Sequence, residues 1–259
     1  MINKRLNVFT ALYVTGLYLF LYVPILVLVA FSFNSEPFPA PWSSFTLKWY
    51  KELWDAMQIW AALYNSLIVA VAATTLSLLM AIALVYYMVH RTRAKRYVGL
   101  FYANLTIPEI VLAVGLLSVF VGCSIPLGRM TLIVAHTVLG LGYAVPLLYA
   151  GYETIDYNLI EASLDLGASY RQTFFWVVLP LLLPSIFVAS LLVFIISFDD
   201  FVLSYFCSGS TAQTLPLYIL SMLRTGVSPV VNALSTGLLI LSGLIVLVFC
   251  YLAVKVRLL

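Results

Sequence analysis

The sequence is poor in charged residues. Of its 259 residues only 9% are charged, whereas a soluble domain of this size carries about 25%. Hydrophobic residues make up 64% of the chain, and its net charge is only +3. The basic residues are scattered over connecting segments, which argues against a nucleic-acid-binding surface, since that requires a concentrated basic face. The composition therefore predicts a polytopic membrane protein that forms one membrane domain, residues 1–259.

The chain also lacks the motifs of common catalytic sites. It has no GxxxxGK[ST] stretch to cradle nucleotide phosphates, and neither HExxH nor GxSxG occurs. Its two histidines are far apart: we expect His90 to be solvated and His136, inside an apolar run, to hydrogen-bond between helices. We therefore expect no catalytic residue, no metal site and no cofactor. Energy for any transport has to come from another chain or from an ion gradient.

Cysteine is scarce as well. Cys123, Cys207 and Cys250 are widely spaced, which is neither a disulfide framework nor a metal-binding pattern. A disulfide between Cys123 and Cys207 stays open, because both can lie near the outer surface, but free thiols are favoured. The N-terminal apolar run is long and is not followed by a small-residue cleavage site, which indicates a retained first span.

Long apolar runs are what the sequence has in abundance. A helix needs about 20 apolar residues to cross the hydrocarbon layer of a bilayer. Six runs reach that length: Leu12–Phe33, Ala61–Val89, Tyr97–Gly122, Thr131–Ala150, Pro184–Phe206 and Ala233–Val254. We expect an all-α protein with six transmembrane helices. Prolines inside these runs, such as Pro24, Pro108 and Pro146, are tolerated where neighbouring helices cover the freed backbone groups.

Lysine and arginine indicate the orientation, because they concentrate in cytoplasmic loops. One side of the predicted membrane carries nine of them: Lys4, Arg5, Arg91, Arg93, Lys95, Arg96, Arg171, Lys255 and Arg257. The other side carries four: Lys48, Lys51, Arg129 and Arg224. The side with nine is predicted to be cytoplasmic, so both termini and the segment 151–184 face the cytoplasm.

Two outer loops stand out in this topology. The segment Asn34–Trp60 is rich in tryptophan, which most simply forms an interfacial aromatic belt, although contact with a soluble partner stays open. The segment Cys207–Val231 can contain a short lateral helix around Leu217–Leu223.

The main polar interruption runs from Asp156 to Pro184. Asn158 or Asp156 can cap a short helix that extends through Leu166. Gly167 follows, and glycine suits the left-handed turn that ends a helix. A helix that stops at such a turn leaves the chain free to start another one immediately.

The second half of this interruption carries its own helix signals. Ser169 and Gln172 have capping-box spacing, so a second helix can start there. Pro180 and Pro184 are expected to interrupt that helix near its return into lipid. Glu161 lies in the first turns of the preceding helix, where the positive end of the helix dipole favours a carboxylate. The pattern predicts a helix, a turn and a helix on the membrane face; an ordinary amphipathic loop is the alternative.

The spacing within this segment resembles the EAA loop of ABC importer permeases. Glu161-Ala162-Ser163 is followed by Gly167 and, after nine more residues, by Val177-Val178-Leu179-Pro180. The family pattern has Ala at the position of Ser163 and Ile at the position of Val177. The resemblance implies a type I ABC importer permease (MetI-like) architecture, in which the loop at about 151–184 docks into a groove of the ATPase subunit. The coupling residues it implies are Glu161, Ala162, Ser163, Gly167, Leu179 and Pro180.

Three acidic residues lie inside the apolar runs: Glu109 in the third and Asp199 and Asp200 in the fifth. A charge at mid-membrane costs about 2.5–3.5 kcal/mol even on lenient insertion scales. These acids either sit near the outer ends and are hydrated, or face a water-filled path and attract a cation. Asp199 and Asp200 point about 100° apart on a helix, so at most one faces such a path squarely. Tyr205 and Phe206 follow closely and could offer cation–π faces.

A narrower resemblance covers nearly the whole chain, namely to the permeases of spermidine/putrescine importers. It is carried, besides the EAA loop, by SFNS at Ser32–Ser35, LKWY at Leu47–Tyr50, FDDFV at Phe198–Val202, LPLYI at Leu215–Ile219 and GVSP with NAL at Gly226–Leu234. It implies a polyamine importer of the bacterial cell inner membrane. The implied partners are a second permease subunit, an ATPase dimer that binds the ATP, and a periplasmic polyamine-binding protein. Relatives often carry Glu where this chain has Val230, which leaves the preferred polyamine open.

The expected function is therefore a permease subunit that moves spermidine or putrescine by alternating access. The substrate path is expected to include Asp199, Asp200, Glu109 and Tyr205. Three alternatives are open. The first is the same machine with another cation, an amino acid or an iron complex as cargo, and the second is an ion-coupled carrier or channel that needs no ATPase. A structural membrane scaffold is a third.

Overall fold

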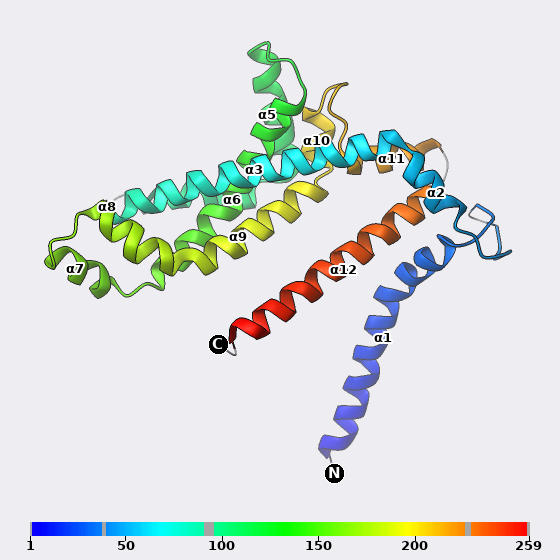
Figure 1. Ribbon diagram of the computed structural model, residues 1–259, viewed down its shortest axis with the longest axis horizontal. Coiled ribbons are helices and arrows are strands. Elements are labelled where there is room, and N and C mark those ends of the chain that lie inside the picture. Colours follow the sequence, from blue (N-terminus) through cyan, green and yellow to red (C-terminus); the bar gives the residue numbers. More distant parts are fainter. Residues whose placement is uncertain (1, 38–39, 91–95, 226–228, 258–259) are drawn as a thin grey trace. The chain divides into compact units, whose positions relative to one another are not determined.

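The structure of the protein is a computed structural model. It describes residues 2–37, 40–90, 96–225 and 229–257. Within these ranges every regular element is a helix, apart from an isolated bridge between Asn34 and Phe45 (Figure 1), so the all-α prediction is confirmed. Three basic residues used to predict the orientation lie outside the described residues: Arg91, Arg93 and Lys95.

The chain divides into two compact units, Met1–Ile59 with Ile219–Leu259, and Trp60–Tyr218. The first unit holds α1 (Ile2–Phe31), α2 (Lys48–Asp55) and α12 (Pro229–Arg257). The second holds α3 (Met57–His90), α4 (Val98–Thr106), α5 (Glu109–Gly122), α6 (Arg129–Glu153), α7 (Tyr157–Asp165), α8 (Tyr170–Thr173), the π-helix η2 (Phe174–Val178), α9 (Leu179–Asp199) and α10 (Val202–Cys207). Between them, α11 (Leu215–Thr225) includes the predicted lateral helix.

Four helical segments in the described part of the chain are long and apolar enough to cross a membrane: Thr10–Phe31, Met57–His90, Arg129–Glu153 and Tyr170–Asp199. They overlap the predicted first, second, fourth and fifth spans, and the sixth, Ala233–Val254, falls within α12. Pro24 and Pro146 lie inside α1 and α6, as expected. The spans are therefore well placed by apolar length, and the differences concern how two of them are broken.

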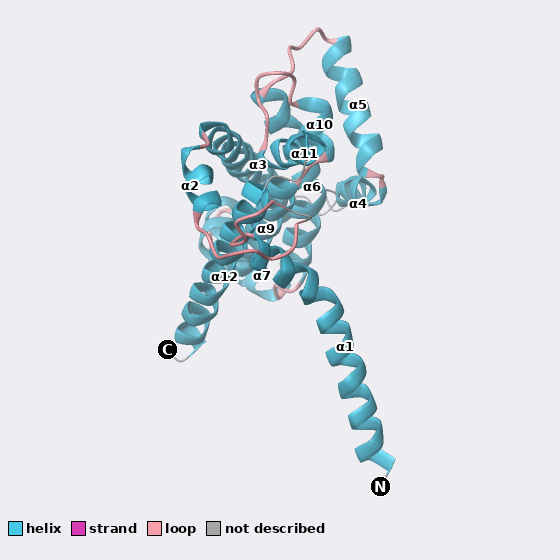
Figure 2. Ribbon diagram, turned by 90° about the vertical axis from the view of Figure 1, so that its right-hand side faces the viewer, coloured by secondary structure: helices cyan, strands magenta, loops and turns pink. Residues whose placement is uncertain are grey.

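The third predicted span, Tyr97–Gly122, is two helices rather than one. The axes of α4 and α5 differ by 110° at a short break, and Figure 2 shows α5 standing away from α4 at this bend. Ile107 and Pro108 are extended at the break, with ψ of 128° and 132°. A residue before proline is pushed out of the helical region, and proline itself has no N–H for the helix. The expectation that Pro108 is accommodated in a continuous helix is therefore wrong.

The fifth predicted span begins earlier than expected. The helical path runs without a stop from Tyr170 to Asp199. Pro180 lies in the first turn of α9, and Pro184 stays inside that helix. The predicted interruption at these prolines is therefore wrong, and a π-helical turn at Phe174–Val178 takes its place. Proline has no N–H to donate to the preceding turn, and Pro180 directly follows the π-helical turn, where the regular α-helical hydrogen-bond pattern is already interrupted.

The same span ends earlier than expected. Asp200 has an extended conformation, with ψ of 127°, and helix resumes only at Val202. The predicted continuous span to Phe206 is therefore wrong in its last turns. A second break thus lies next to the acidic pair.

Helix α6 is the centre of the second unit. The most apolar part of this helix is 72% buried, against 17% for the Tyr170–Asp199 segment. A Cβ atom on Gly151 would overlap the side chain of Ser185, so glycine is required where α9 crosses α6. Ser77 of α3 donates a hydrogen bond to the Thr137 carbonyl of α6 at 3.0 Å. The acidic and coupling segments described below are attached to this core.

The segment between α1 and α2 is ordered around Asn34. The Asn34 side chain donates to the Glu36 and Pro41 carbonyls and accepts from the Ser43 amide, and Trp49 Nε1 donates to the Asn34 carbonyl at 2.6 Å. Trp49 is buried, so it does not belong to the predicted interfacial belt. Three other tryptophans remain exposed: Trp42, Trp54 and Trp60. Cys123 is an exposed free thiol and Cys207 a buried one.

Candidate functional sites: a surface knob and a pair of helix breaks

The first candidate site is the segment between α6 and α9, in which local signals act as predicted. The Asp156 side chain accepts a hydrogen bond from the Asn158 amide at 3.0 Å and starts α7. Gly167 has φ of +86°, the left-handed conformation expected after α7. Ser169 and Gln172 form a reciprocal capping box that starts α8. The helix, turn and helix predicted from the sequence are therefore confirmed.

The surface of α7 carries the residues implied by the EAA pattern. Glu161 and Ala162 are exposed, and so is Gly167. Glu161 lies in the second turn of α7, because the first turn holds no acidic residue. The explanation of Glu161 by the helix dipole is therefore wrong, since that effect fades beyond the first turn. Its exposure instead leaves the carboxylate available to another chain.

The opposite face of this segment is anchored in the helical core. Ile160 of α7 is 3% exposed and Phe174 of η2 is 2% exposed, and both join a cluster with residues of α3, α6 and α9. The Phe174 ring packs edge-on against Tyr86 of α3, with ring centroids 5.0 Å apart. A force on α7 or η2 is therefore transmitted to the long helices through packed side chains rather than lost in a loose loop.

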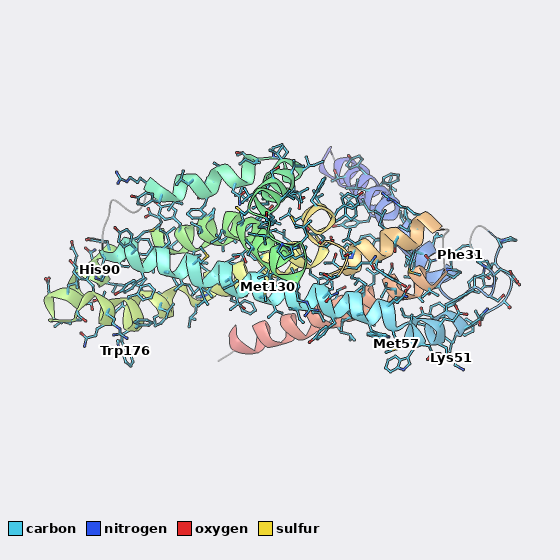
Figure 3. All side chains as sticks on the ribbon, turned by 90° about the horizontal axis from the view of Figure 1, so that it is seen from above. Phe31, Lys51, Met57, His90, Met130 and Trp176 are labelled. Carbon is cyan, nitrogen blue, oxygen red and sulfur yellow. The ribbon has the colours of Figure 1, made fainter. Side chains whose placement is uncertain are left out.

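Helix α3 reaches this segment through its last residue. The His90 ring lies 4.5 Å from the Tyr170 ring of α8 and 5.1 Å from the Tyr86 ring, measured between centroids. His90 is exposed, as expected, but its ring also packs against these two tyrosines. Figure 3 shows His90 and Trp176 at the same end of the second unit.

Two hydroxyls join the arms of the segment. Ser163 Oγ of α7 lies 3.0 Å from Thr173 Oγ1 of α8, and Thr173 is fully buried. Ser163 stands where the EAA pattern has alanine, so this hydrogen bond is a feature that the family pattern does not predict. It holds α7 and α8 in one orientation around the turn at Gly167.

The outer surface of the segment is apolar as well as polar. Leu166 is 90% exposed and Trp176 is 81% exposed. A shallow, open hollow beside them is lined by Ser169, Arg171, Gln172, Phe175 and Trp176. Leu179 packs against the core cluster, whereas Pro180 is exposed at the start of α9. Large exposed side chains beside a hollow, on an otherwise anchored segment, form a surface suited to a protein partner. We call this segment, 156–180, the coupling knob.

The second candidate site lies where the two helix breaks carry acidic residues. Glu109 is the first residue of α5, immediately after the break at Pro108. Asp199 ends α9, and Asp200 occupies the break before α10. In transporters, interrupted helices often bring helix ends and free backbone groups to the substrate path.

Asp200 is buried, at 6% exposure, and its carboxylate is fully engaged. Its Oδ2 accepts from the Ser204 amide at 2.9 Å, and its Oδ1 accepts from the Leu203 amide at 3.4 Å. Oδ2 also lies 3.4 Å from Nε2 of His136. The carboxylate that seemed to have no partner in the sequence therefore accepts from the first turn of α10 and lies beside a histidine of α6.

His136 is the functional residue that sequence reasoning placed correctly but did not connect to the acids. Its Nδ1 lies 2.8 Å from Ser197 Oγ of α9, which confirms the predicted hydrogen bond between helices. Its contact with Asp200 joins residues 64 positions apart in the chain, and no local pattern announces it. The signal that could have predicted this contact was the presence of one histidine and one acidic residue in two different apolar runs.

Glu109, Asp199 and Tyr205 differ from Asp200 in being exposed. The Glu109 carboxyl is close enough to Asp200 to hydrogen-bond with it, and close enough to His136 to interact electrostatically. It also lies in the first turn of α5, where the helix dipole favours a negative charge. Asp199 sits at the C-terminal end of α9, where the dipole disfavours a negative charge, so a cation nearby would stabilise it.

Tyr205 lies on α10, the helix that follows Asp199 and Asp200 in the chain. Its ring is half exposed and packs 5.7 Å from the Phe201 ring and 5.4 Å from the Phe206 ring, between centroids. Aromatic faces of this kind can hold an organic cation. Within the described ranges, no group of three or more histidine, cysteine, aspartate and glutamate side chains is arranged to hold a metal ion. The chemistry on offer is reversible attraction of a cation.

Comparisons with known proteins found a matching family and similar proteins over most of the chain. A family described as "Binding-protein-dependent transport system inner membrane component" matches residues 73–257. The chain is 38% identical over 240 residues to the spermidine/putrescine transport system permease protein PotC of Escherichia coli (strain K12), covering 91% of this chain and 90% of that protein. It is 32% identical over 245 residues to the putrescine transport system permease protein PotI of the same organism, covering 91% and 87%. A solved bacterial ABC transporter for import of the acidic polysaccharide alginate superposes with a TM-score of 0.70 at 16% identity, covering 98% of this chain and 96% of that one.

Proposed function

The chain belongs to the family of binding-protein-dependent transport system inner membrane components, and from that premise we propose that it imports polyamines. It is a transport subunit and not an enzyme, so a separate ATPase hydrolyses the ATP. The observation that supports polyamines as the cargo is the 38% identity to PotC over 91% of the chain. The fold does not select the cargo, because the alginate transporter shares it.

The complex proposed around this chain has four kinds of subunit. This chain pairs with a second permease resembling PotB, and an ATPase dimer resembling PotA binds the ATP. A periplasmic polyamine-binding protein resembling PotD delivers the cargo. Residues 1–259 form a single membrane domain with both termini in the cytoplasm, which places the coupling knob on the side of the ATPase.

The coupling knob gives this proposal a mechanical basis. Glu161 and Leu166 face outward from α7, where an ATPase can contact them, while Ile160 and Phe174 are packed into the core of the second unit. Movement of the ATPase pair then displaces α7 and η2 together with α3, α6 and α9. Alternating access follows if that displacement opens the path at its outer end.

The residues at the two helix breaks supply the groups that would contact the cargo along the substrate path. Asp199 and Glu109 offer exposed carboxylates and Tyr205 an exposed ring, while Asp200 is occupied by its own hydrogen bonds. Two exposed acids attract an ammonium group without enclosing it, and weak binding of this kind permits release. An elongated polyamine can pass such a site one charged group at a time.

Uptake by cells tests the cargo directly. Cells lacking their own polyamine importers would receive this chain with its partner subunits, and uptake of labelled spermidine and putrescine would be measured against unlabelled amino acids, iron chelates and neutral sugars. Polyamine uptake that only polyamines compete for is expected. Competition by another class of solute would assign that cargo instead.

The energy source distinguishes an ATP-driven importer from the remaining alternative, an ion-coupled carrier. Uptake should stop when the ATPase carries a substitution that abolishes ATP hydrolysis, and it should persist when an uncoupler is added with ATP held constant. Uptake that collapses with the uncoupler and ignores the ATPase substitution would identify an ion-coupled carrier.

A further inference from the structure

The imidazole of His136 contacts the chain on both sides of the break between α9 and α10. Its Nδ1 is 2.8 Å from Ser197 Oγ, one turn before the break. Its Nε2 is 3.5 Å from Ser204 Oγ, one turn after it, and 3.4 Å from Oδ2 of Asp200 at the break itself. His136 belongs to α6, so a single buried side chain ties the central helix to both segments of the interrupted one.

The hydrogen bonds around the ring form one consistent chain. Asp200 accepts two backbone N–H groups of α10, one on each carboxylate oxygen. Nε2–H of His136 can then donate to Asp200, and Nδ1 accepts from the Ser197 hydroxyl. In this arrangement the imidazole uses both nitrogens, and the buried carboxylate keeps a donor on each oxygen.

Helix α10 would transmit any movement at the break to the exposed acids. It packs against α5, which begins with Glu109, and against α6. The Asp200 carboxylate holds the first turn of α10, and Thr131 of α6 donates to the Cys207 carbonyl at its far end, at 2.8 Å. The position of α10 is therefore set by α6 at both ends.

We propose that His136 is a positioning residue that fixes α9 and α10 relative to each other at the break between them. We call its contacts with Ser197, Asp200 and Ser204 the pin. It keeps Asp200 turned toward the α10 amides, which leaves Asp199 and Glu109 as the carboxylates that meet the cargo. The expected effect on cargo rests on the proposed transport function. The contacts of the pin can be tested without transport. Loss of the pin frees α10 and changes the rate of translocation more than the apparent affinity for the cargo.

Two substitutions of His136 separate its two arms. His136→Gln places an amide N–H near the position of Nε2 and can still donate to Asp200. His136→Asn places its amide near Nδ1 and reaches Ser197 but falls short of Asp200. The structure therefore predicts that glutamine rescues the function of the histidine and asparagine does not.

The native Cys207 reports on the pin without any cargo. It is fully buried on α10, so in full transporter complexes with Cys123→Ser and Cys250→Ser its alkylation by N-ethylmaleimide in membrane vesicles requires α10 to open. Alkylation should be about tenfold faster in His136→Asn, because losing a hydrogen bond to a charged group shifts a local opening equilibrium by that order. His136→Gln should match the parent. The proposal would be overturned if Cys207 were alkylated at the same rate in the parent, His136→Asn and His136→Gln. It would also be overturned if both variants were alkylated equally fast.

Serine variants keep the test valid if His136→Asn is lost from the membrane. Ser197→Ala removes one arm of the pin and should also speed alkylation. Ser190→Ala is the matched control, because Ser190 lies on the same helix and its hydroxyl donates within that helix, to the Phe187 carbonyl one turn back at 2.7 Å. Equal rates for these two variants would overturn the proposal.

Polyamine uptake completes the experiment. With the pin in place as proposed, His136→Asn lowers the maximal uptake rate at nearly unchanged half-saturation, and His136→Gln restores it. A parent transporter that moves no polyamine would refute the proposed function, while the alkylation rates would still decide whether the pin exists. A changed half-saturation with an unchanged maximal rate would contradict the positioning role.

Discussion

Ser163 and Thr173 join the two arms of the coupling knob through hydroxyls 3.0 Å apart. Ser163 occupies the position at which the EAA pattern has alanine, and Thr173 is fully buried on the other side of the Gly167 turn. The family motif therefore carries in this chain a polar contact of its own. It connects α7 directly to α8 across the turn, so that a displacement of one helix acts on the other.

Ser163→Ala should lower the stability of the purified permease by about 1–3 kcal/mol, because it leaves a buried hydroxyl without this partner. Thermal unfolding in detergent would measure the loss. The double variant with Thr173→Val should recover part of it, since replacing both partners by apolar groups is nearly neutral. Strictly additive losses would mean that the two hydroxyls are not coupled.

Gly167→Ala should cost about 1–2 kcal/mol, the penalty of a left-handed conformation for a residue with a Cβ atom. No atom lies within 4 Å of where that Cβ would be, so the cost is backbone strain and not a clash. Gly167→Asn should cost less, because asparagine tolerates this conformation. Gly99→Ala is the control, since Gly99 is helical and also has open space where a Cβ atom would be. An equal loss of stability in Gly99→Ala would show that the left-handed φ of Gly167 is not the cause.

Glu161→Lys should prevent co-purification with the ATPase while leaving the unfolding temperature of the permease unchanged, because Glu161 is exposed. Reversing a charge that is buried at an interface weakens binding by about 2–5 kcal/mol. Glu36→Lys is the matched charge reversal, on the loop predicted to face outward. Full ATPase binding by Glu161→Lys would exclude Glu161 from the contact.

Single cysteines should show the predicted sidedness, in a background without the three native ones. Ser44→Cys and Ser210→Cys should react with an impermeant thiol reagent in intact spheroplasts. Leu166→Cys should react only in inside-out vesicles stripped of the ATPase, and Leu166 is preferred to Ser169 because Ser169 caps α8. The reverse pattern would invert the topology.

The acids at the two breaks should behave differently when neutralised. Asp199→Asn and Glu109→Gln should each lower polyamine uptake about fivefold below saturation, the effect of roughly 1 kcal/mol of lost ion pairing, with normal abundance in the membrane. Asp200→Asn should instead lower the unfolding temperature, because asparagine has only one acceptor oxygen and its NH2 group would face an α10 amide or His136, at a cost of about 1–3 kcal/mol. Normal uptake by both exposed-acid variants would take these acids off the path.

Local signals in the sequence determined the coupling knob. Asp156, Gly167 and the Ser169–Gln172 box each act within a few residues of chain, so their caps and turn follow from neighbouring backbone groups. The membrane spans follow equally directly, because a long apolar run has no other stable environment than lipid or a protein core. These features needed no knowledge of what packs against what.

Tertiary structure alone decided the roles of the acids. Asp199 and Asp200 are neighbours of one residue type, and nothing local distinguishes them. The break in the helix turns Asp200 toward the α10 amides and His136, while Asp199 stays exposed. The energy of a carboxylate in a membrane protein depends on the donors around it, and His136 comes from a helix 64 residues earlier in the chain. Whether a buried charge is a cost, a cap or a site for cargo is therefore settled by packing and not by sequence position.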